Sequence, residues 1–144
     1  MMTWCPEKQI LFSGDAFGSF GAIDGAVFDG QIDLDAYEDE ILRYFSNIVG
    51  KYSGMVQKAF AKLKDLDIKI IAATHGPVWK DDPGYVISRY DRWSRHEPQP
   101  GVVLAWASMY GNTEKMSEVV AEGIRSTGLK KIVIHDVSKV HPSY

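Results

Sequence analysis

The sequence predicts an α/β protein in two parts. Short apolar runs that suit strands alternate with longer segments in which apolar residues repeat at helical spacing. At residues 97–101 (EPQPG) two prolines and a glycine fall close together, which is typical of a linker. The part after this linker follows the order strand, helix, strand. Such a βαβ unit implies parallel strands joined by a right-handed crossover.

The part before the linker is expected to hold two short strands and three helices. In chain order we expect a strand at 9–13, an irregular glycine-rich stretch at 18–30, helices at 35–48 and 53–66, a strand at 68–74 and a helix from 82. Asp35 is the expected N-cap of the first helix, because Glu38 completes a capping box. Pro83 suits the first position of the last helix. The buried face of the second helix is expected to carry Met55, Ala59, Phe60 and Leu63.

The part after the linker is expected to contain a strand at 102–107, a polar turn at 108–112, a helix at 113–126 and a strand at 131–136. A doubly wound sheet needs at least two or three further strands, so we expect this second unit to be cut short. The strand at 102–107 would be central in such a sheet, and here one of its edges stays open. Because open apolar edges recruit other strands, we expect a homo-oligomer.

Charge and composition exclude several partners. The 144 residues carry 16 basic and 19 acidic side chains in mixed order, for a net charge of −3, so no basic stripe is available for nucleic acid. The apolar runs are far too short for a bilayer span and the start lacks a signal-peptide pattern, so we expect no membrane association. The single cysteine, Cys5, excludes an internal disulfide and suits the reducing cytoplasm.

The turn after the strand at 102–107 has the features of a phosphate-binding loop. A helix starts directly after the turn, so backbone N–H groups and the positive end of the helix dipole point at one place. Ser108, Asn112 and Thr113 add side-chain donors, and Gly111 lets the backbone approach a ligand closely. Without a lysine, the turn suits flavin mononucleotide (FMN) better than a triphosphate with magnesium. The same spacing is expected if Ser108 and Asn112 only cap the helix, and both interpretations stay open.

Asp15 and His75 are candidate metal ligands, because each follows an apolar strand. Carboxylate and imidazole groups at strand ends can converge on one ion. Taken alone, however, a Gly-Asp pair is more often a turn and a single histidine more often a structural residue. The two residues by themselves therefore favour the structural interpretation.

Longer motifs resemble known families. Residues 108–113 (SMYGNT) resemble the flavodoxin signature for the FMN phosphate, and residues 11–18 (LFSGDAFG) resemble the strand that carries the bridging aspartate of metallo-β-lactamase-like proteins. Residues 74–77 (THGP) resemble the strand end with the last histidine ligand of those proteins. Residues 21–29 (GAIDGAVFD) resemble the corresponding segment of flavodiiron proteins, and Trp79 and a helix with Tyr90 and Trp93 follow the order of that family. Nearly the whole chain therefore resembles a flavodiiron protein.

The resemblance implies a specific fold and specific site residues. Residues 1–96 would be the C-terminal part of a metallo-β-lactamase-like αββα sandwich, 97–101 a linker, and 102–144 the first βαβ unit of a flavodoxin-like doubly wound parallel sheet. Asp15 would bridge two irons and His75 would bind one of them. The family's other ligands lie upstream of the aspartate and are absent here. The residues that would wrap the FMN phosphate are Ser108, Met109, Tyr110, Gly111, Asn112 and Thr113.

The function that the resemblance implies is that of an oxidoreductase. Such a protein passes electrons from FMN to a two-iron centre that reduces dioxygen to water, nitric oxide to nitrous oxide, or both, with a rubredoxin or a related reductase as electron donor. With two ligands alone, we expect this chain to be inactive. Two alternatives remain: an FMN-dependent electron-carrier module without catalysis, and a metallo-β-lactamase-type hydrolase in which Asp15 and His75 hold zinc and a hydroxide.

Overall fold

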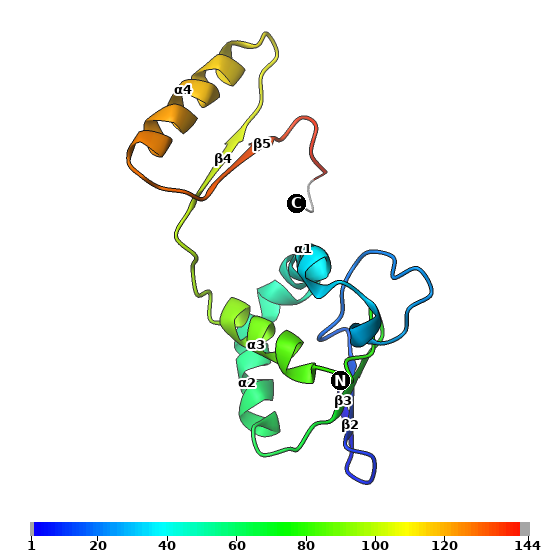
Figure 1. The fold of residues 1–144 in the computed structure, drawn as a ribbon. Coiled ribbons are helices and arrows are strands. Elements are labelled where there is room, and N and C mark those ends of the chain that lie inside the picture. The colour runs from blue at the N-terminus through cyan, green and yellow to red at the C-terminus, as the bar shows by residue number, and fades with distance from the viewer. Residues whose placement is uncertain (1, 142–144) are drawn as a thin grey trace. The chain divides into compact units, whose positions relative to one another are not determined.

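The computed structural model describes residues 2–141 (Figure 1). Contacts within the chain divide it into two compact units, which separate between Glu97 and Pro98. Both units combine helices with a parallel pair of strands, so the predicted α/β class is confirmed. None of the helices in this part of the chain has the length and apolar character needed to cross a membrane.

A three-stranded sheet forms the centre of the first unit. β1 (Thr3–Cys5) runs antiparallel to β2 (Ile10–Gly14), and β2 runs parallel to β3 (Ile70–Ala73). The strands predicted at 9–13 and 68–74 are therefore present. The sequence gives no sign of β1, because three residues are too few for an alternating pattern to show.

Helical segments make up much of the rest of this unit. They are η1 (Asp29–Gln31), α1 (Leu34–Tyr44), the π-helical η2 (Phe45–Val49), η3 (Gly50–Tyr52), α2 (Ser53–Leu63) and α3 (Pro83–Ser94). The side chain of Asp33 caps α1 by accepting the N–H groups of Asp35 and Ala36, so the prediction of Asp35 as N-cap is wrong. Aspartate at either position satisfies the cap preference, and only the backbone geometry distinguishes them. Pro83 is the first residue of α3, as predicted, and Asp82 caps the helix by accepting the Tyr85 N–H.

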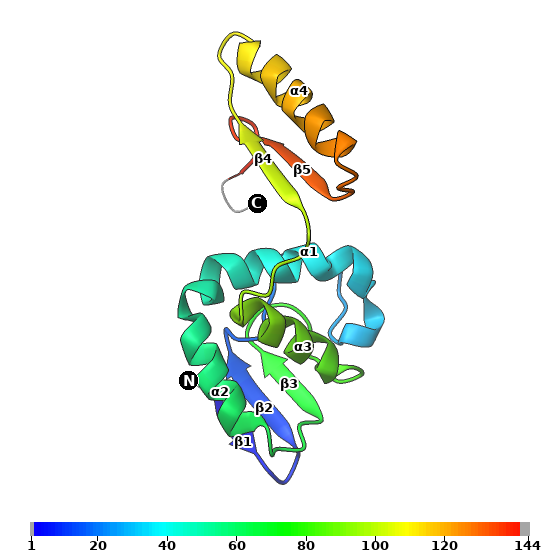
Figure 2. The ribbon, with the colours of Figure 1, turned by 90° about the vertical axis from the view of Figure 1, so that its left-hand side faces the viewer.

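The core lies where α2 and α3 cover one face of the sheet (Figure 2). Leu11 and Ile71 of the sheet share this core with Val86 and Tyr90 of α3, and none of the four is more than 1% exposed. On α2 the prediction is wrong for Met55, which is 66% exposed, and the partly buried Ala59 is not among the residues that pack against the core. The α2 residues that pack against the core are Val56, Phe60 and Leu63, because a helical stripe through Phe60 and Leu63 passes through 56 rather than 55.

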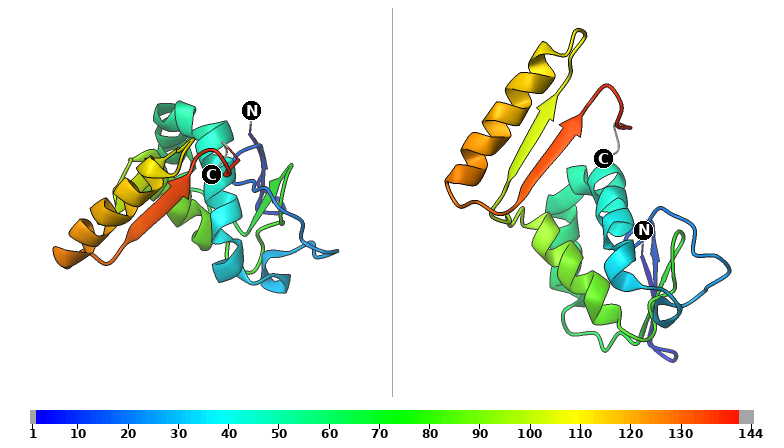
Figure 3. Two further views of the ribbon diagram at one scale, coloured as in Figure 1. Left: turned by 90° about the horizontal axis from the view of Figure 1, so that it is seen from above. Right: turned by 45° about the horizontal axis from the view of Figure 1, so that its top comes forward.

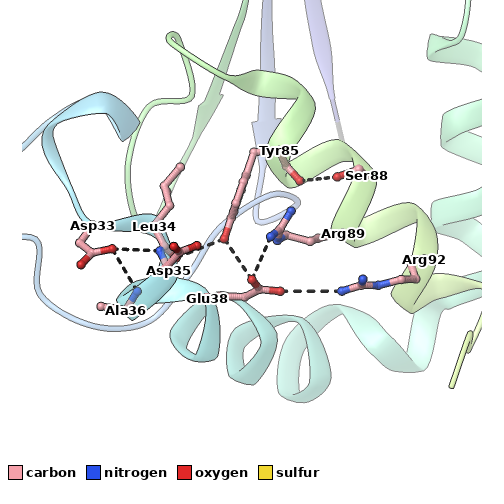
Figure 4. Close-up of polar contacts among 9 residues, drawn as sticks. All are labelled: Asp33, Leu34, Asp35, Ala36, Glu38, Tyr85, Ser88, Arg89 and Arg92. Carbon is pink, nitrogen blue, oxygen red and sulfur yellow. Dashed lines mark hydrogen bonds and ion pairs between the residues drawn. The ribbon is translucent and has the colours of Figure 1, made fainter. Parts of the chain in front are cut away.

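Charged groups join α1 to α3 (Figure 4). Glu38 on α1 accepts hydrogen bonds from Arg89 Nη2 at 2.9 Å and from the Tyr85 hydroxyl at 3.2 Å, and its other oxygen lies 3.7 Å from Arg92 Nη2. The Arg89 guanidinium also lies over the Tyr85 ring, 3.4 Å from its centroid. The hydrogen bond from Arg89 holds the pKa of Glu38 below its ordinary value, against the opposing effect of burial.

A buried carboxylate, Asp29, fixes the segment that leads into α3. The residue is 1% exposed. Its Oδ1 accepts the N–H groups of Lys80 (2.8 Å) and Asp81 (3.0 Å), and its Oδ2 accepts that of Asp82 (2.7 Å). Burial raises the pKa of Asp29, but these donors together outweigh burial and leave it below its ordinary value. The ionised carboxylate therefore satisfies three successive backbone donors.

The second unit is a βαβ motif, as predicted. β4 (Val102–Trp106) and β5 (Ile132–Asp136) pair in parallel and in register over their whole length. α4 (Asn112–Ser126) connects them and lies along one side of the pair (Figure 3). Among the described residues β4 pairs with no strand other than β5, and Val103 of β4 is 69% exposed.

Replacing Asp29 with asparagine is expected to destabilise the first unit by about 2 kcal/mol, because the amide loses the charge and presents an N–H₂ group to a backbone donor. Urea unfolding, followed by near-ultraviolet circular dichroism, measures the change. Asp24→Asn is the matched control, since Asp24 is exposed, and it should leave the unfolding midpoint unchanged. Equal midpoints for Asp29→Asn and the wild type would contradict this role.

The Glu38 network predicts a loss of stability in acid. Because the folded pKa of Glu38 lies below its ordinary value of 4.5, the stabilisation is complete above that pH and is lost as the pH falls through the folded pKa. Glu38→Gln should therefore be less stable than the wild type by about 1 kcal/mol at neutral pH, and the difference should shrink in acid. Urea unfolding across this pH range tests it. Asp39→Asn, on an exposed position of the same helix, should show no such pH-dependent difference.

Candidate functional site

The carboxyl ends of β2 and β3 bring Asp15 and His75 together. Because the two strands are parallel, their ends meet at one edge of the sheet, where the Thr74 N–H donates to the Gly14 carbonyl oxygen at 3.0 Å. His75 Nε2 lies 3.8 Å from Asp15 Oδ1, and both side chains are more than half exposed. The structure thus places side by side two residues that the sequence could only identify separately.

Thr74 orients the carboxylate of Asp15. Its hydroxyl donates a hydrogen bond to Asp15 Oδ1 at 3.1 Å. Groups that hydrogen-bond to a ligating carboxylate fix its direction at metal sites. The local sequence predicts no role for Thr74, whose one signal is its place directly before His75.

The loop after Asp15 is held in an uncommon backbone conformation by buried donors. Phe17 has a φ of 65°, in the left-handed region, although its side chain is packed in the core at 2% exposure. Trp79 Nε1 donates to the Phe17 carbonyl oxygen at 2.8 Å, and the Tyr90 hydroxyl donates to that of Gly18 at 3.2 Å. The core therefore sets the path of the backbone that carries Asp15.

The backbone beside His75 is equally constrained. Gly76 has a φ of 80°, and a Cβ at this position would collide with the Ser19 hydroxyl. Only glycine satisfies both the backbone conformation and the lack of space. The turn after β3 therefore brings His75 to the sheet edge, and position 76 in this turn has no room for a residue other than glycine.

Tyr44 packs beside the Asp15–His75 pair. Its ring centroid is 5.9 Å from that of His75. Burial and, after it, the negative charge of Asp15 raise the pKa of Tyr44. Burial likewise raises the pKa of Tyr90, with further contributions from Tyr44 and Asp15. The phenols of Tyr44 and Tyr90 therefore stay protonated at neutral pH.

These residues do not by themselves fit a two-iron centre. Two irons need several carboxylate and imidazole ligands to offset their charge and to fix their geometry. Within residues 2–141, no group of three or more His, Cys, Asp and Glu side chains is placed to hold a metal ion. Asp15 and His75 can supply two ligands, and the others would have to come from outside this stretch.

The candidate phosphate loop follows β4 and ends at α4. Gly111 is the N-cap of α4 with a φ of 79°, and the Thr113 N–H donates to Ser108 Oγ at 3.3 Å. The helix begins at Asn112, one residue earlier than predicted, so Asn112 lies within the helix and is not its cap. Of the two residues considered as caps, Ser108 alone binds a backbone donor of the first turn.

The loop suits a phosphate group. A Cβ at Gly111 would meet nothing within 4 Å, so the positive φ rather than lack of space explains the glycine. The polar groups at the start of the 15-residue α4 stand where the helix dipole favours an anion. Met109 and Tyr110 are 86% and 85% exposed and add apolar surface beside these donors. The loop therefore combines neutral hydrogen-bonding groups with exposed, largely apolar side chains.

Comparisons with known proteins agree on one family. No protein-family model matches the chain. The nitric oxide reductase of Moorella thermoacetica is 35% identical over 130 residues, which cover 89% of this chain and 32% of that protein. The crystal structure of the flavodiiron protein from Giardia intestinalis superimposes with a TM-score of 0.91 at 33% identity, covering 99% of this chain and 35% of the other. Rubredoxin oxygen:oxidoreductase from Desulfovibrio gigas matches with a TM-score of 0.91 at 28% identity, covering 99% and 36%.

The fold and these similarities define the class as α/β proteins in which metallo-β-lactamase-like and flavodoxin-like parts are joined. Within that class, the relatives and solved structures that the chain matches are flavodiiron proteins. It spans about a third of the length of the relatives that it matches. The predicted fold and the predicted family resemblance are both confirmed.

Because only two ligand side chains converge within residues 2–141, we expect the purified 144-residue chain to hold fewer than two irons per molecule. Elemental analysis after anaerobic loading with ferrous iron and desalting measures this content. Asp15→Ala, compared with Asp24→Ala as control, should lower any residual binding. Two irons per chain in the wild type would show that this ligand count is wrong.

Proposed function

We propose that this chain is part of a flavodiiron oxidoreductase that passes electrons from FMN to a two-iron centre and reduces dioxygen to water, nitric oxide to nitrous oxide, or both. The observation that carries the proposal is the convergence of Asp15, Thr74 and His75 at one sheet edge in a chain that also holds the loop at 108–113. The names of the similar proteins, a nitric oxide reductase and a rubredoxin oxygen:oxidoreductase, support both substrates.

In this proposal the two units divide the work. Residues 1–96 contribute Asp15 and His75 as two ligands of the metal centre, residues 97–101 link the units, and residues 102–144 bind FMN through the phosphate loop. FMN supplies electrons singly or in pairs when it is bound. The loop residues would hold the phosphate by neutral hydrogen bonds, and Thr74 would keep the Asp15 carboxylate in a fixed direction.

The proposal includes a partner, an assembly and a compartment. A rubredoxin or a related reductase would donate the electrons, as the name of the Desulfovibrio gigas protein suggests. Copies of the protein would associate, since an exposed apolar strand such as β4 favours pairing. The single cysteine, Cys5, supports a place in the reducing cytoplasm.

A chimera tests the proposed function. The segment of the Moorella thermoacetica nitric oxide reductase that matches this chain is replaced by the chain, and the consumption of nitric oxide and of dioxygen is measured. We expect the chimera to reduce at least one of the two gases. Asp15→Ala should abolish this activity, whereas the control His96→Ala, which changes the residue directly before the linker, should leave it intact. A folded chimera that contains iron and FMN but reduces neither gas would refute the proposal. Zinc content with esterase activity would favour a hydrolase instead.

The phosphate loop predicts weak but specific flavin binding by the chain itself. Thr113→Ala should weaken FMN binding by about 1–2 kcal/mol, the scale of one hydrogen bond to a charged group. Quenching of flavin fluorescence in a titration measures the affinity. Thr127→Ala, at the opposite end of α4, is the control and should leave the affinity unchanged. An equal effect of both substitutions would show that this loop does not bind the FMN phosphate.

A further inference from the structure

The outer side of α2 carries an exposed row of lysines with no acidic residue nearby in the sequence. Met55, Lys58 and Lys62 follow one another at helical spacing on this side, and Lys51 in η3 extends the row one turn earlier. No Asp or Glu occurs between Glu40 and Asp65. We call the surface formed by Lys51, Tyr52, Met55, Lys58 and Lys62 the lysine face.

The lysine face is not needed to hold the fold together. The opposite side of α2 packs into the core, and Gln57 attaches α2 to α3 by donating to Asp91 Oδ1 (2.9 Å) and Ser94 Oγ (2.7 Å). Met55 and Tyr52 remain 66% and 51% exposed. Both the hydrophobic contact and the polar contact of α2 are therefore made elsewhere on the helix.

The charges of this face are unsatisfied within the chain. Among the described residues, no carboxylate forms an ion pair with Lys51, Lys58 or Lys62, whereas Lys69 and Lys139 each pair with a nearby aspartate. Lys51 Nζ lies 4.9 Å from the centroid of the neighbouring Tyr52 ring. Because the whole chain has a net charge of −3, the face also differs in sign from the chain as a whole.

We propose that the lysine face is a docking surface for an acidic protein that presents an apolar side chain among its carboxylates. The lysines would attract and orient such a partner, and Met55 and Tyr52 would supply the apolar contact, since methionine and tyrosine are enriched in protein interfaces. A nucleic acid is disfavoured by the overall negative charge. A lipid surface is disfavoured because the face offers only two large apolar side chains.

The proposal is tested on the full 144-residue chain with a short fluorescent peptide rich in glutamate and leucine as the probe. Fluorescence anisotropy gives the affinity at low ionic strength and at about 0.15 M salt. At the higher salt concentration, exposed charges more than about 8 Å apart are largely screened from one another. We expect binding that weakens with salt. The triple variant Lys51→Gln, Lys58→Gln, Lys62→Gln should lower the low-salt affinity about tenfold.

The control triple variant carries the same charge change on exposed lysines elsewhere, Lys8→Gln, Lys64→Gln and Lys130→Gln, and should stay within about twofold of the wild type. Met55→Ser, which leaves the charge unchanged, should weaken binding about threefold through lost apolar contact. Circular dichroism of every variant confirms the native fold before binding is measured.

Three results would overturn the proposal. One is the absence of salt-dependent binding of the peptide by the wild type. Another is an equal loss of affinity in the two triple variants, which would mean that net charge alone controls the interaction. The third is a stronger, lysine-face-dependent binding to phosphatidylserine vesicles than to the peptide, which would assign the face to a membrane.

Discussion

The parallel pairing of β2 with β3 is the constraint on which the first unit depends. Parallel strands end at the same edge of a sheet, so this pairing alone brings Asp15 and His75, far apart in the sequence, to within 3.8 Å. At this edge the Thr74 N–H donates a hydrogen bond to the Gly14 carbonyl oxygen, and the Thr74 hydroxyl donates one to the Asp15 carboxylate. The parallel pairing of β2 and β3 therefore determines which side chains meet at the candidate site.

Trp79 connects this edge to the rest of the core. Its backbone exchanges hydrogen bonds with Ile71 of β3, its indole N–H binds the Phe17 carbonyl oxygen, and its ring stacks on Tyr85 with centroids 6.0 Å apart. Through these three contacts one fully buried residue couples the sheet, the Asp15 loop and the start of α3. The Asp29 carboxylate accepts hydrogen bonds from the three backbone N–H groups directly after Trp79. The path of the chain from the sheet to α3 is therefore fixed at several successive residues.

The sequence predicts best those features that depend on neighbouring residues in the chain. Patterns of neighbouring residues predict the strands at 9–13 and 68–74, the proline at the start of α3 and the βαβ order, and all of these are present. The predictions of Asp35 as N-cap and of Met55 as buried failed because a shift of one or two positions leaves the pattern almost the same. The hydrogen bond from Thr74 to Asp15 and the three donors around Asp29 depend on residues distant in the chain, and no local pattern encodes them.

The same distinction separates the two candidate sites. The phosphate loop is made by contiguous residues between one strand and one helix, so a single βαβ unit can form its geometry, with Gly111 in the left-handed region and Ser108 already bound to the Thr113 N–H. The sheet-edge site instead depends on how many strands end there, and the described strands bring only two ligand side chains to it. A stretch covering about a third of its relatives can therefore form the whole of the candidate phosphate loop and only two ligands of the proposed metal centre.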